Sequence, residues 1–418
     1  MRNFCAITLL LLFTAVGQTI YAQGTKTIIT GTIKDEQQKG IPGATVKVKN
    51  ESTGFTAFAV TNTNGIYIFN ELPLGSPYSV SVTAVGYGEQ KQVDYALNLA
   101  DQLQINFALQ PNASQLKEVQ VVANTLKRSI KTLGASTAIT SKELTRLPVN
   151  GRNFTSLIDL SPVSNGSTLA GQLASSTNYT IDGMTARSTI AGGNSGGAYS
   201  ISMEAIREFK VVTNEYDVTN GRSGGGSITT VTKSGTNTLS GGAFTFGRTN
   251  WLSSNYNLNG SKRSQQFSTY QYGFSLGGPI IKDKAHFFIA WDHQADARPL
   301  YIADIQTPAD IVRYKVTQPT LDKFSQVAHD KYGTSANPQF GSFGKKKRTD
   351  AAFARIDWQL NRSNLLTIRN NFIYDLDNQA DGDNSGINMF EVYADRKSVN
   401  NSLMASLRTV FGKGVTNE

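Results

Sequence analysis

Apolar and polar residues alternate along residues 284–293, whose sequence is KAHFFIAWDH. The same alternation recurs in residues 270–277, YQYGFSLG, and in residues 351–360, AAFARIDWQL. Successive side chains of a strand point to opposite faces, so each run predicts a strand with one apolar and one mostly polar face. A strand between lipid and a wet lumen needs this pattern. The runs therefore predict a transmembrane antiparallel β-sheet, with a soluble sandwich as the alternative.

The connections between these runs alternate in length. After a first run at 243–247, the long links are 248–269, 294–350 and 375–398, and the short ones are 278–283 and 361–364. Outer-membrane barrels have long extracellular loops and short periplasmic turns. The alternation favours such a barrel, with about six of its strands in residues 237–418.

The first residues predict an export signal. Residues 1–22 contain a basic start at Arg2, an apolar run and a small residue, Ala22, at the end. Cys5, the only cysteine of the chain, lies inside this segment. The exported chain is therefore expected to have no thiol catalysis and no cysteine-based zinc site. No later stretch approaches about 18 uninterrupted apolar residues, so no transmembrane helix is expected.

Residues 23–112 predict a small β-sandwich. Short alternating runs at 29–33, 44–48, 67–69 and 78–82 are separated by turn residues such as Pro42-Gly43 and Asn64-Gly65. Together with Leu72-Pro73-Leu74-Gly75 and Gly86-Tyr87, their order resembles the carboxypeptidase regulatory-like domain. This resemblance implies an accessory sandwich without peptidase activity, and an unrelated immunoglobulin-like module is the alternative.

An exposed β-prone run follows the polar linker at residues 111–114. It consists of Glu118, Val119, Gln120, Val121 and Val122. An unpaired run of this kind is a candidate for strand addition by a partner. In TonB-dependent receptors that carry the accessory domain, a similar segment precedes the plug and is bound by the periplasmic protein TonB. The resemblance therefore implies a TonB box at residues 118–122, and the alternative is that the run is the first strand of the plug.

Residues 113–236 and the residue after them contain four ordered motifs: NGRNFTSLIDLSP at 150–162, YTIDGM at 179–184, ISMEAIREFKVV at 201–212 and GRSGGGSITTVTKSGTN at 221–237. Their order resembles the plug domain of TonB-dependent receptors of the Oar-like or SusC-like type. The resemblance makes Asp182, Gly183, Arg222, Gly224, Gly225 and Gly226 candidate plug-motif residues.

The residues of these motifs also predict local structure. Asp182-Gly183 suits a tight hairpin turn, and residues 204–208 predict a short helix that leads into a strand at 209–212. Glycines 224, 225 and 226 would allow the backbone to pack closely against a barrel wall. They lack the Gly-Lys-Ser/Thr ending of a phosphate-binding loop, so no nucleotide site is expected.

No enzymatic chemistry, cofactor or metal is assigned by the sequence. His286 and His293 fall on opposite faces of one strand, and no catalytic spacing involves the third histidine, His329. Four aspartates, 375, 377, 381 and 383, lie in a predicted loop that could bind calcium, although a solvated loop is the preferred interpretation. The net charge of +9 is dispersed. Its one basic cluster, residues 345–348, is expected in a loop, so nucleic acid is not an expected partner.

The chain as a whole resembles a TonB-dependent outer-membrane receptor. The expected fold is mainly β, with an N-terminal β-sandwich, an α+β plug and the first strands of a transmembrane antiparallel β-barrel. Because the family barrel has about 22 strands, a chain that stops at Glu418 is expected to be a fragment.

The resemblance also implies a location and partners. The location is the outer membrane of a Gram-negative bacterium, and the partners are membrane lipid, TonB with its inner-membrane energising complex, and an extracellular siderophore, glycan or peptide. The implied function is TonB-dependent transport. The alternatives are an outer-membrane component for protein export or surface assembly, and a glycan-binding adhesion protein.

Overall fold

The structure is a computed structural model that describes most of the chain from residue 27 onward. Residues 1–26, which include the predicted export signal, lie outside the described part. The same holds for residues 100, 112–118, 123–134, 141–142, 144–157, 159–160, 162–163, 166–167, 170, 187–200, 214–223, 225, 255, 257–266, 301–304, 306, 336–337, 339, 341–342, 379–386, 390–393 and 412–415.

Two sheets form the N-terminal sandwich. The first contains β1 (Ile28–Lys34), β4 (Ile66–Asn70), β7 (Gln102–Gln104) and β8 (Phe107–Ala108). The second contains, in spatial order, β3 (Thr56–Val60), β2 (Thr45–Asn50), β5 (Gly75–Thr83), β6 (Gln90–Leu97) and β9 (Val119–Val122). Side chains of both sheets, among them Ile29, Val46 and Tyr67, share one buried core. The predicted alternation is confirmed in β1, where every second residue is buried.

A five-stranded central sheet follows along the chain. Its spatial order is β10 (Ala135–Thr140), β15 (Ile206–Thr213), β16 (Gly226–Thr232), β13 (Thr177–Ile181) and β14 (Met184–Thr185). Smaller elements accompany it: β11 (Ser164–Asn165), β12 (Thr168–Leu169), η3 (Ala174–Ser176) and η5 (Met203–Ala205). The prediction of a helix over residues 204–208 is therefore wrong in its extent. Only one 3-10 turn forms, because Ile206 already pairs with Thr232 of β16.

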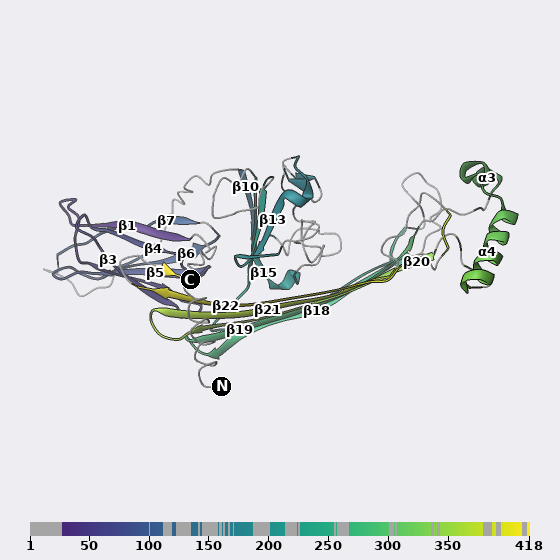
Figure 1. The fold of residues 1–418 in the computed structure, drawn as a ribbon. Helices are drawn as coiled ribbons and strands as arrows, with labels where there is room; N and C mark the ends of the chain where they lie inside the picture. The colour runs from purple at the N-terminus through teal and green to yellow at the C-terminus, as the bar shows by residue number, and fades with distance from the viewer. Residues whose placement is uncertain are drawn as a thin grey trace, which may run out of the picture.

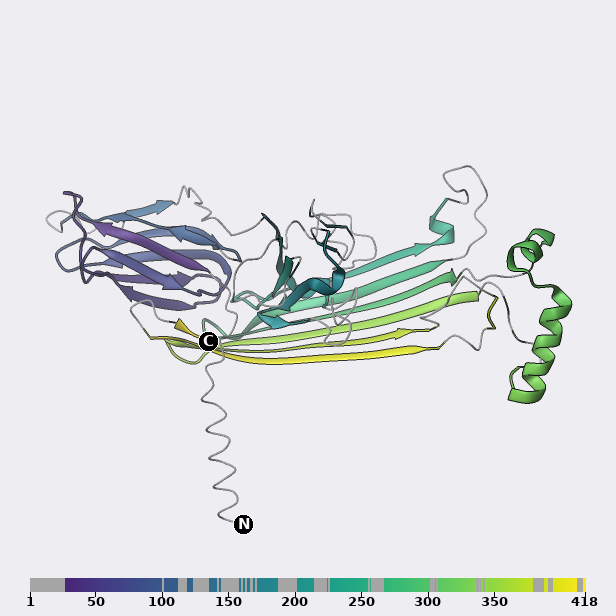
Figure 2. The ribbon, with the colours of Figure 1, turned by 45° about the horizontal axis from the view of Figure 1, so that its top comes forward.

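A long antiparallel sheet contains the remaining strands in chain order (Figures 1 and 2). They are β17 (Ser240–Thr249), β18 (Ser268–Ile281), β19 (Ala285–Leu300), β20 (Phe343–Gln359), β21 (Asn364–Asp377), β22 (Arg396–Val410) and the short β23 (Thr416–Asn417), with η6 (Asn250–Leu252) after β17. The three alternating runs of the sequence lie in β18, β19 and β20. The prediction of an antiparallel sheet from them is confirmed.

Long and short connections lie at opposite ends of this sheet. Turns at 282–284 and 360–363 join strands at the end near the sandwich (Figure 1). The connection 301–342 at the other end contains two helices, α3 (Pro308–Tyr314) and α4 (Gln318–Tyr332). Among the described residues, no helix is long and apolar enough to cross a membrane.

The predicted bounds of two long links are wrong, because β19, β20 and β21 extend further than expected. The basic cluster at 345–348 lies in β20, and Asp375 and Asp377 lie in β21. Lys345 is paired with Asp377 at 3.1 Å, and Lys347 with Asp375 at 3.5 Å. These cross-strand charge pairs stabilise polar sequence in a strand. They also occupy two of the four aspartates for which calcium binding was the less favoured alternative to a solvated loop, and Asp381 and Asp383 lie outside the described residues.

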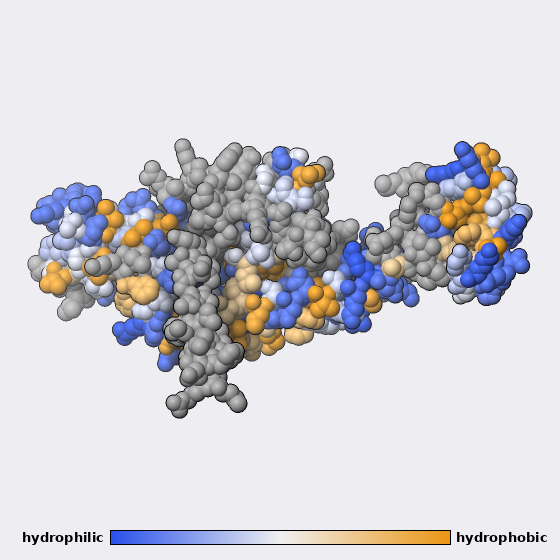
Figure 3. Space-filling view, in the orientation of Figure 1, coloured by the Kyte–Doolittle hydropathy of each residue, from blue (hydrophilic) through white to orange (hydrophobic). Residues whose placement is uncertain are grey.

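The two faces of the long sheet differ in polarity. The outward face, which points away from the central sheet, exposes Tyr272, Phe274, Ile356 and Trp358. Figure 3 shows hydrophobic side chains along the underside of this sheet. Inward-facing residues such as Phe288 and Phe353 instead pack into the core of the central sheet. The inward face also carries polar groups, such as Asp292 and Arg355, which bond to residues of the central segment. The predicted separation into an apolar face and a more polar face is therefore confirmed.

Candidate functional site at the contact of the central and long sheets

A tight turn at the end of β13 positions the first functional side chain. Ile181 pairs with Met184, so Asp182 and Gly183 form a two-residue loop. Their φ angles are +47° and +81°. Positive φ at both central residues is the requirement of a type I′ hairpin turn, which Asp-Gly satisfies well. The prediction of a hairpin turn here is confirmed.

The Asp182 carboxylate fastens this turn to the end of β16. Its Oδ1 accepts a hydrogen bond from the Thr232 amide at 2.9 Å, and its Oδ2 accepts one from the Thr232 hydroxyl at 2.8 Å. Both carboxylate oxygens are therefore held by groups of the central sheet itself. The turn presents a fixed negative charge to the inward face of the long sheet.

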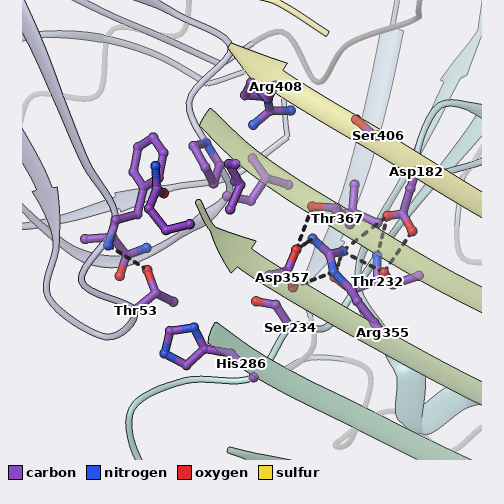
Figure 4. A pocket seen from close by; sticks show the side chains of 18 of the residues that line it. Thr53, Asp182, Thr232, Ser234, His286, Arg355, Asp357, Thr367, Ser406 and Arg408 are labelled. Carbon is purple, nitrogen blue, oxygen red and sulfur yellow. Dashed lines mark hydrogen bonds and ion pairs between the residues drawn. The ribbon is translucent and has the colours of Figure 1, made fainter. Parts of the chain in front are cut away.

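Two arginines of the long sheet meet this charge, and Figure 4 shows one of them, Arg355, beside Asp182. Arg369 of β21 places Nε 2.8 Å from Asp182 Oδ2, and its Nη2 donates to the carbonyl of Ile181 at 2.7 Å. Arg355 of β20 lies 3.9 Å from Asp182 Oδ1 and donates to Thr232 Oγ1 at 2.9 Å. The Arg369 side chain is only 1% exposed. Its charge is therefore almost removed from water.

Asp357 completes the arrangement, which we call the Asp182 cluster: Asp182, Thr232, Arg355, Asp357 and Arg369. Nε and Nη2 of Arg355 each donate to one Asp357 oxygen at 2.8 Å, a two-point pair that fixes the guanidinium plane. Thr367 also donates to Asp357 at 2.8 Å. The cluster links the central sheet to the long sheet by charges of opposite sign. Such a buried contact is costly to break, because separation leaves charges without partners.

A cavity of about 110 Å³ adjoins the cluster, where all three parts of the fold meet (Figure 4). The sandwich contributes Asn50 and Leu74, the central segment Arg207, and the long sheet His286 and Arg408. Ligand pockets for small molecules occupy about 300–1,000 Å³. The cavity therefore suits a few waters at an interface rather than a transported ligand.

Two hydrogen bonds join the sandwich to the central sheet beside this cavity. Arg207 Nη1 donates to the Leu74 carbonyl at 2.8 Å, and the Leu99 amide donates to Glu208 at 3.0 Å. Burial lowers the pKa of Arg207. Burial raises the pKa of the Glu208 carboxyl, although the Leu99 amide and the charge of Arg207 oppose the rise. The contact therefore contains a carboxyl group, that of Glu208, whose ionised form is disfavoured by burial.

The predicted TonB box lies apart from the Asp182 cluster. Glu118 is outside the described residues, and the backbone of 119–122 forms β9. This strand pairs in parallel with β6 at the edge of the sandwich sheet, not with the central sheet. The alternative that the run begins the plug sheet is therefore not what the structure shows. The first strand of the central sheet along the chain is β10.

The glycines of the predicted plug motif serve a different contact from the one expected. Arg222 and Gly225 lie outside the described residues, and a Cβ on Gly224 would meet only ordinary contacts. Gly226 has φ +151°, and a Cβ there would lie 2.5 Å from the Val212 carbonyl oxygen. The close packing at Gly226 is thus inside the central sheet, because β16 pairs with β15. The expected packing of these glycines against a barrel wall is wrong for Gly226.

Gly235 makes the close approach to the long sheet. A Cβ at Gly235 would lie 2.2 Å from the Phe287 carbonyl oxygen and 2.8 Å from that of Gly278. Both oxygens are backbone atoms of β19 and β18. Sequence reasoning placed Gly235 in a motif but gave it no role. The available signal was its position just before the first strand of the long sheet.

The histidines have structural partners. His286 is buried, with Nε2 2.9 Å from Asn237 Oδ1, and His293 Nδ1 lies 2.7 Å from Asp350 Oδ1. Register places His286 opposite Asp357 on the inward face and His293 opposite Asp350 on the outward face. The prediction that they lie on opposite faces is confirmed. Within the described part of the chain, no group of three or more potential metal ligands occurs.

Comparison with known proteins agrees with this architecture. The family described as "Carboxypeptidase regulatory-like domain" matches residues 28–110, and the family described as "Outer membrane beta barrel domain" matches residues 231–313. The chain therefore resembles an accessory sandwich in its N-terminal part and an outer-membrane barrel in the first strands of its long sheet.

Among curated proteins, the chain is similar to the TonB-dependent transporter Oar of Myxococcus xanthus. The two are 27% identical over 299 residues, which is 65% of this chain and 27% of Oar. The chain thus spans about a quarter of the length of this relative. The match to the outer-membrane barrel family and the similarity to Oar indicate that this chain is located in the outer membrane of a Gram-negative bacterium.

Two solved structures are similar to part of this chain. The outer-membrane transporter YddB of Escherichia coli is 15% identical, with a TM-score of 0.44 over 68% of this chain and 38% of YddB. A mutant of the ferric enterobactin receptor PfeA of Pseudomonas aeruginosa is 12% identical, with a TM-score of 0.45 over 66% of this chain and 38% of PfeA.

Proposed function

We propose that the protein carries out TonB-dependent active transport of a ligand across the outer membrane. In this proposal residues 23–112 form the accessory sandwich, residues 113–236 the TonB box and plug, and residues 237–418 barrel strands. The central sheet acts as the plug, and the Asp182 cluster holds it on the barrel wall. TonB binds the segment 118–122 and pulls the plug away. The ligand class, a siderophore, glycan or peptide, stays open.

The position of β9 carries this proposal. The sandwich contacts the long sheet at the end with the short turns: the Asn237 amide donates to the Ser52 carbonyl at 2.7 Å, and Leu365 packs on the sandwich core. In outer-membrane barrels, short turns face the periplasm. β9 lies at this end of the sheet, which supports access by a periplasmic partner. This position also argues against the sandwich as a cell-surface adhesion module.

A proline in β9 tests the proposal. Proline removes a backbone donor from a strand, so Val121→Pro is expected to abolish binding of the purified periplasmic domain of TonB. The matched control is Val85→Pro. Val85 is fully exposed in a turn closed by the bond from the Tyr87 amide to the Ala84 carbonyl, and Gly86 follows with φ +85°. This is the position where a type II turn favours proline. Undiminished TonB binding by Val121→Pro would contradict the assignment of the box.

A further inference from the structure

The charged side chains on the outward face of the long sheet lie together at one end. Register places Lys346, Arg348 and Asp350 of β20 on this face, together with Lys397 of β22. The other outward-facing residues of β17 to β22 whose side chains the structure describes carry no charge. The gathering of all outward charges at the end with the long connections therefore needs an explanation.

The three basic residues are close enough to serve one ligand. Arg348 and Lys397 lie on either side of Leu376, which is the register partner of both. Neighbouring strands are about 4.8 Å apart, so the backbone positions of Arg348 and Lys397 are about 10 Å apart. Long side chains reach a common acceptor across this distance. Lys346 is two residues along β20 on the same face, and we call Lys346, Arg348 and Lys397 the outward basic row.

Neighbouring side chains orient two members of the row. Asp350 accepts a hydrogen bond from Arg348 Nε at 3.0 Å and also lies 2.7 Å from His293 Nδ1. Among the described residues, the two terminal nitrogens of Arg348 have no partner. Lys397 Nζ lies 5.3 Å from the centre of the Tyr374 ring, a cation–π distance. The row is therefore an exposed set of donors whose positive charge exceeds that of its one carboxylate neighbour.

The row lies at the margin of the apolar band of the sheet. Ten residues of β20 separate Trp358 from Arg348, which is a rise of about 33 Å along the strand. Strands of outer-membrane barrels tilt by about 35–45°, so the difference in height is about 25 Å, the height of the apolar band. Trp358 adjoins the short turn at 360–363, and short turns face the periplasm. The outward basic row is therefore at the level of the outer-leaflet headgroups.

We propose that the outward basic row binds the phosphate of an outer-leaflet lipid headgroup. The inference goes beyond the proposed function and requires only that the long sheet spans the outer membrane with its short turns at the periplasm. The arginine fork matches two phosphate oxygens, and lysine adds a point charge. The acyl chains of the same lipid lie on the apolar surface below the row, where Tyr272 and Phe274 are exposed. The lipid thus meets both parts of the outward face.

A lipid titration of two variants tests this site. The complete protein in a neutral detergent is titrated with lipid A, a phosphorylated acyl-disaccharide, and bound lipid is counted by native mass spectrometry. The same lipid after removal of its phosphate is the second probe. The test variant is Arg348→Gln with Lys397→Gln. The matched control, Lys323→Gln with Lys331→Gln, removes the same charge from exposed positions of α4, outside the sheet but at the same end of the molecule (Figure 1).

We expect the wild type and the control variant to bind lipid A with equal affinity. The test variant should bind it at least about tenfold more weakly, because two charged hydrogen-bond donors are lost. Removal of the phosphate should weaken binding to the wild type by a similar factor and leave binding to the test variant unchanged. Equal affinity of the wild type for both lipids would overturn the proposal without any variant, since the lipid would then bind by its acyl chains alone. Equal affinity of the test and control variants for lipid A would also overturn it.

Discussion

At the scale of single residues, Asp182 and Arg369 carry the contact between the central and long sheets. The hairpin turn fixes the position of Asp182, and β21 places the Arg369 side chain where it is almost completely buried. A buried cation whose partner is removed is more costly than the pair was favourable, by about 3–5 kcal/mol. Loss of either partner therefore leaves the other charge buried without compensation.

The substitution Asp182→Asn tests this contact. Asparagine tolerates positive φ, so the turn is kept while the charge is lost. We expect the contact to weaken by about 3 kcal/mol and the amides of residues 177–185 to exchange hydrogen faster. Hydrogen exchange of the purified protein measures this effect. Asp94→Asn is the control, because Asp94 also has positive φ (71°) but is exposed in the sandwich. Equal exchange in the two variants would show that the charge pair does not hold the turn.

Glu208 makes the sandwich contact sensitive to pH. Its side chain is 3% exposed, and burial raises its pKa above the ordinary value of 4.5. A carboxyl with a raised pKa binds more protons in the folded state. Its contribution to stability is therefore greatest below pH 4.5 and is lost as the pH rises through the folded-state pKa.

Glu208→Gln should remove this dependence, because the amide oxygen still accepts the Leu99 hydrogen bond but carries no charge. We expect the thermal unfolding midpoint at pH 7 to rise by about 2–4 °C, the shift that ~1 kcal/mol produces in a domain of this size. At pH 4 the midpoint should match that of the wild type. Glu36→Gln, at an exposed turn residue, should change neither value. A lower midpoint at pH 7 would mean that the ionised carboxylate stabilises the contact.

At the scale of elements, the sequence predicted strands better than their ends. Strict alternation located β18, β19 and β20, because one face of each is apolar. Alternation fails where a strand leaves the apolar zone. The extension of β20 through residues 345–348 is stabilised by aspartates of β21 that are about 30 positions away in sequence. A local pattern cannot reveal such partners.

The crossing from the central sheet into the long sheet depends on Gly235. An alanine there would press its Cβ on backbone oxygens of β18 and β19, which cannot rotate away. We expect Gly235→Ala to lower the free energy of unfolding by about 1–3 kcal/mol, the usual cost of overpacking. Chemical denaturation in detergent measures this cost. Gly242→Ala is the control, since no atom lies within 4 Å of its added Cβ. Similar losses in both variants would contradict the role assigned to the close approach.

At the scale of the whole molecule, part of the site was visible in the sequence and part was not. The residue pair Asp182-Gly183 predicts a turn from its sequence alone. Arg355 and Arg369 could not be linked to Asp182, because their contact depends on how the central sheet sits against the long sheet, 173 and 187 positions along the chain. The same limit applies to β9, whose pairing with β6 follows from tertiary placement and not from its own sequence.

The outward face of the long sheet predicts which tryptophans touch lipid. Trp291 and Trp358 both lie on this face, and Trp291 is opposite Ala352, six residues along β20 from Trp358. Six residues of a strand rise about 20 Å, which fits within the ~25 Å apolar band of an outer-membrane barrel. We expect brominated phospholipids to quench the fluorescence of variants that keep only Trp291 or only Trp358. The experiment uses the complete protein, purified from its membrane and reconstituted in vesicles.

An inward-facing tryptophan is the matched control for this experiment. Phe288 follows Phe287 in β19 but points inward, is 7% exposed and packs into the core of the central sheet. In a variant whose three native tryptophans are replaced by phenylalanine, Phe288→Trp should therefore be quenched far less than Trp291 or Trp358. Residues 288 and 291 lie on opposite faces of one strand and only three positions apart, about 10 Å, so both remain within the ~25 Å apolar band and a large difference in quenching reports the face. Equal quenching at 288 and 291 would mean that the central sheet does not shield the inward face, and the plug role would then have no structural basis.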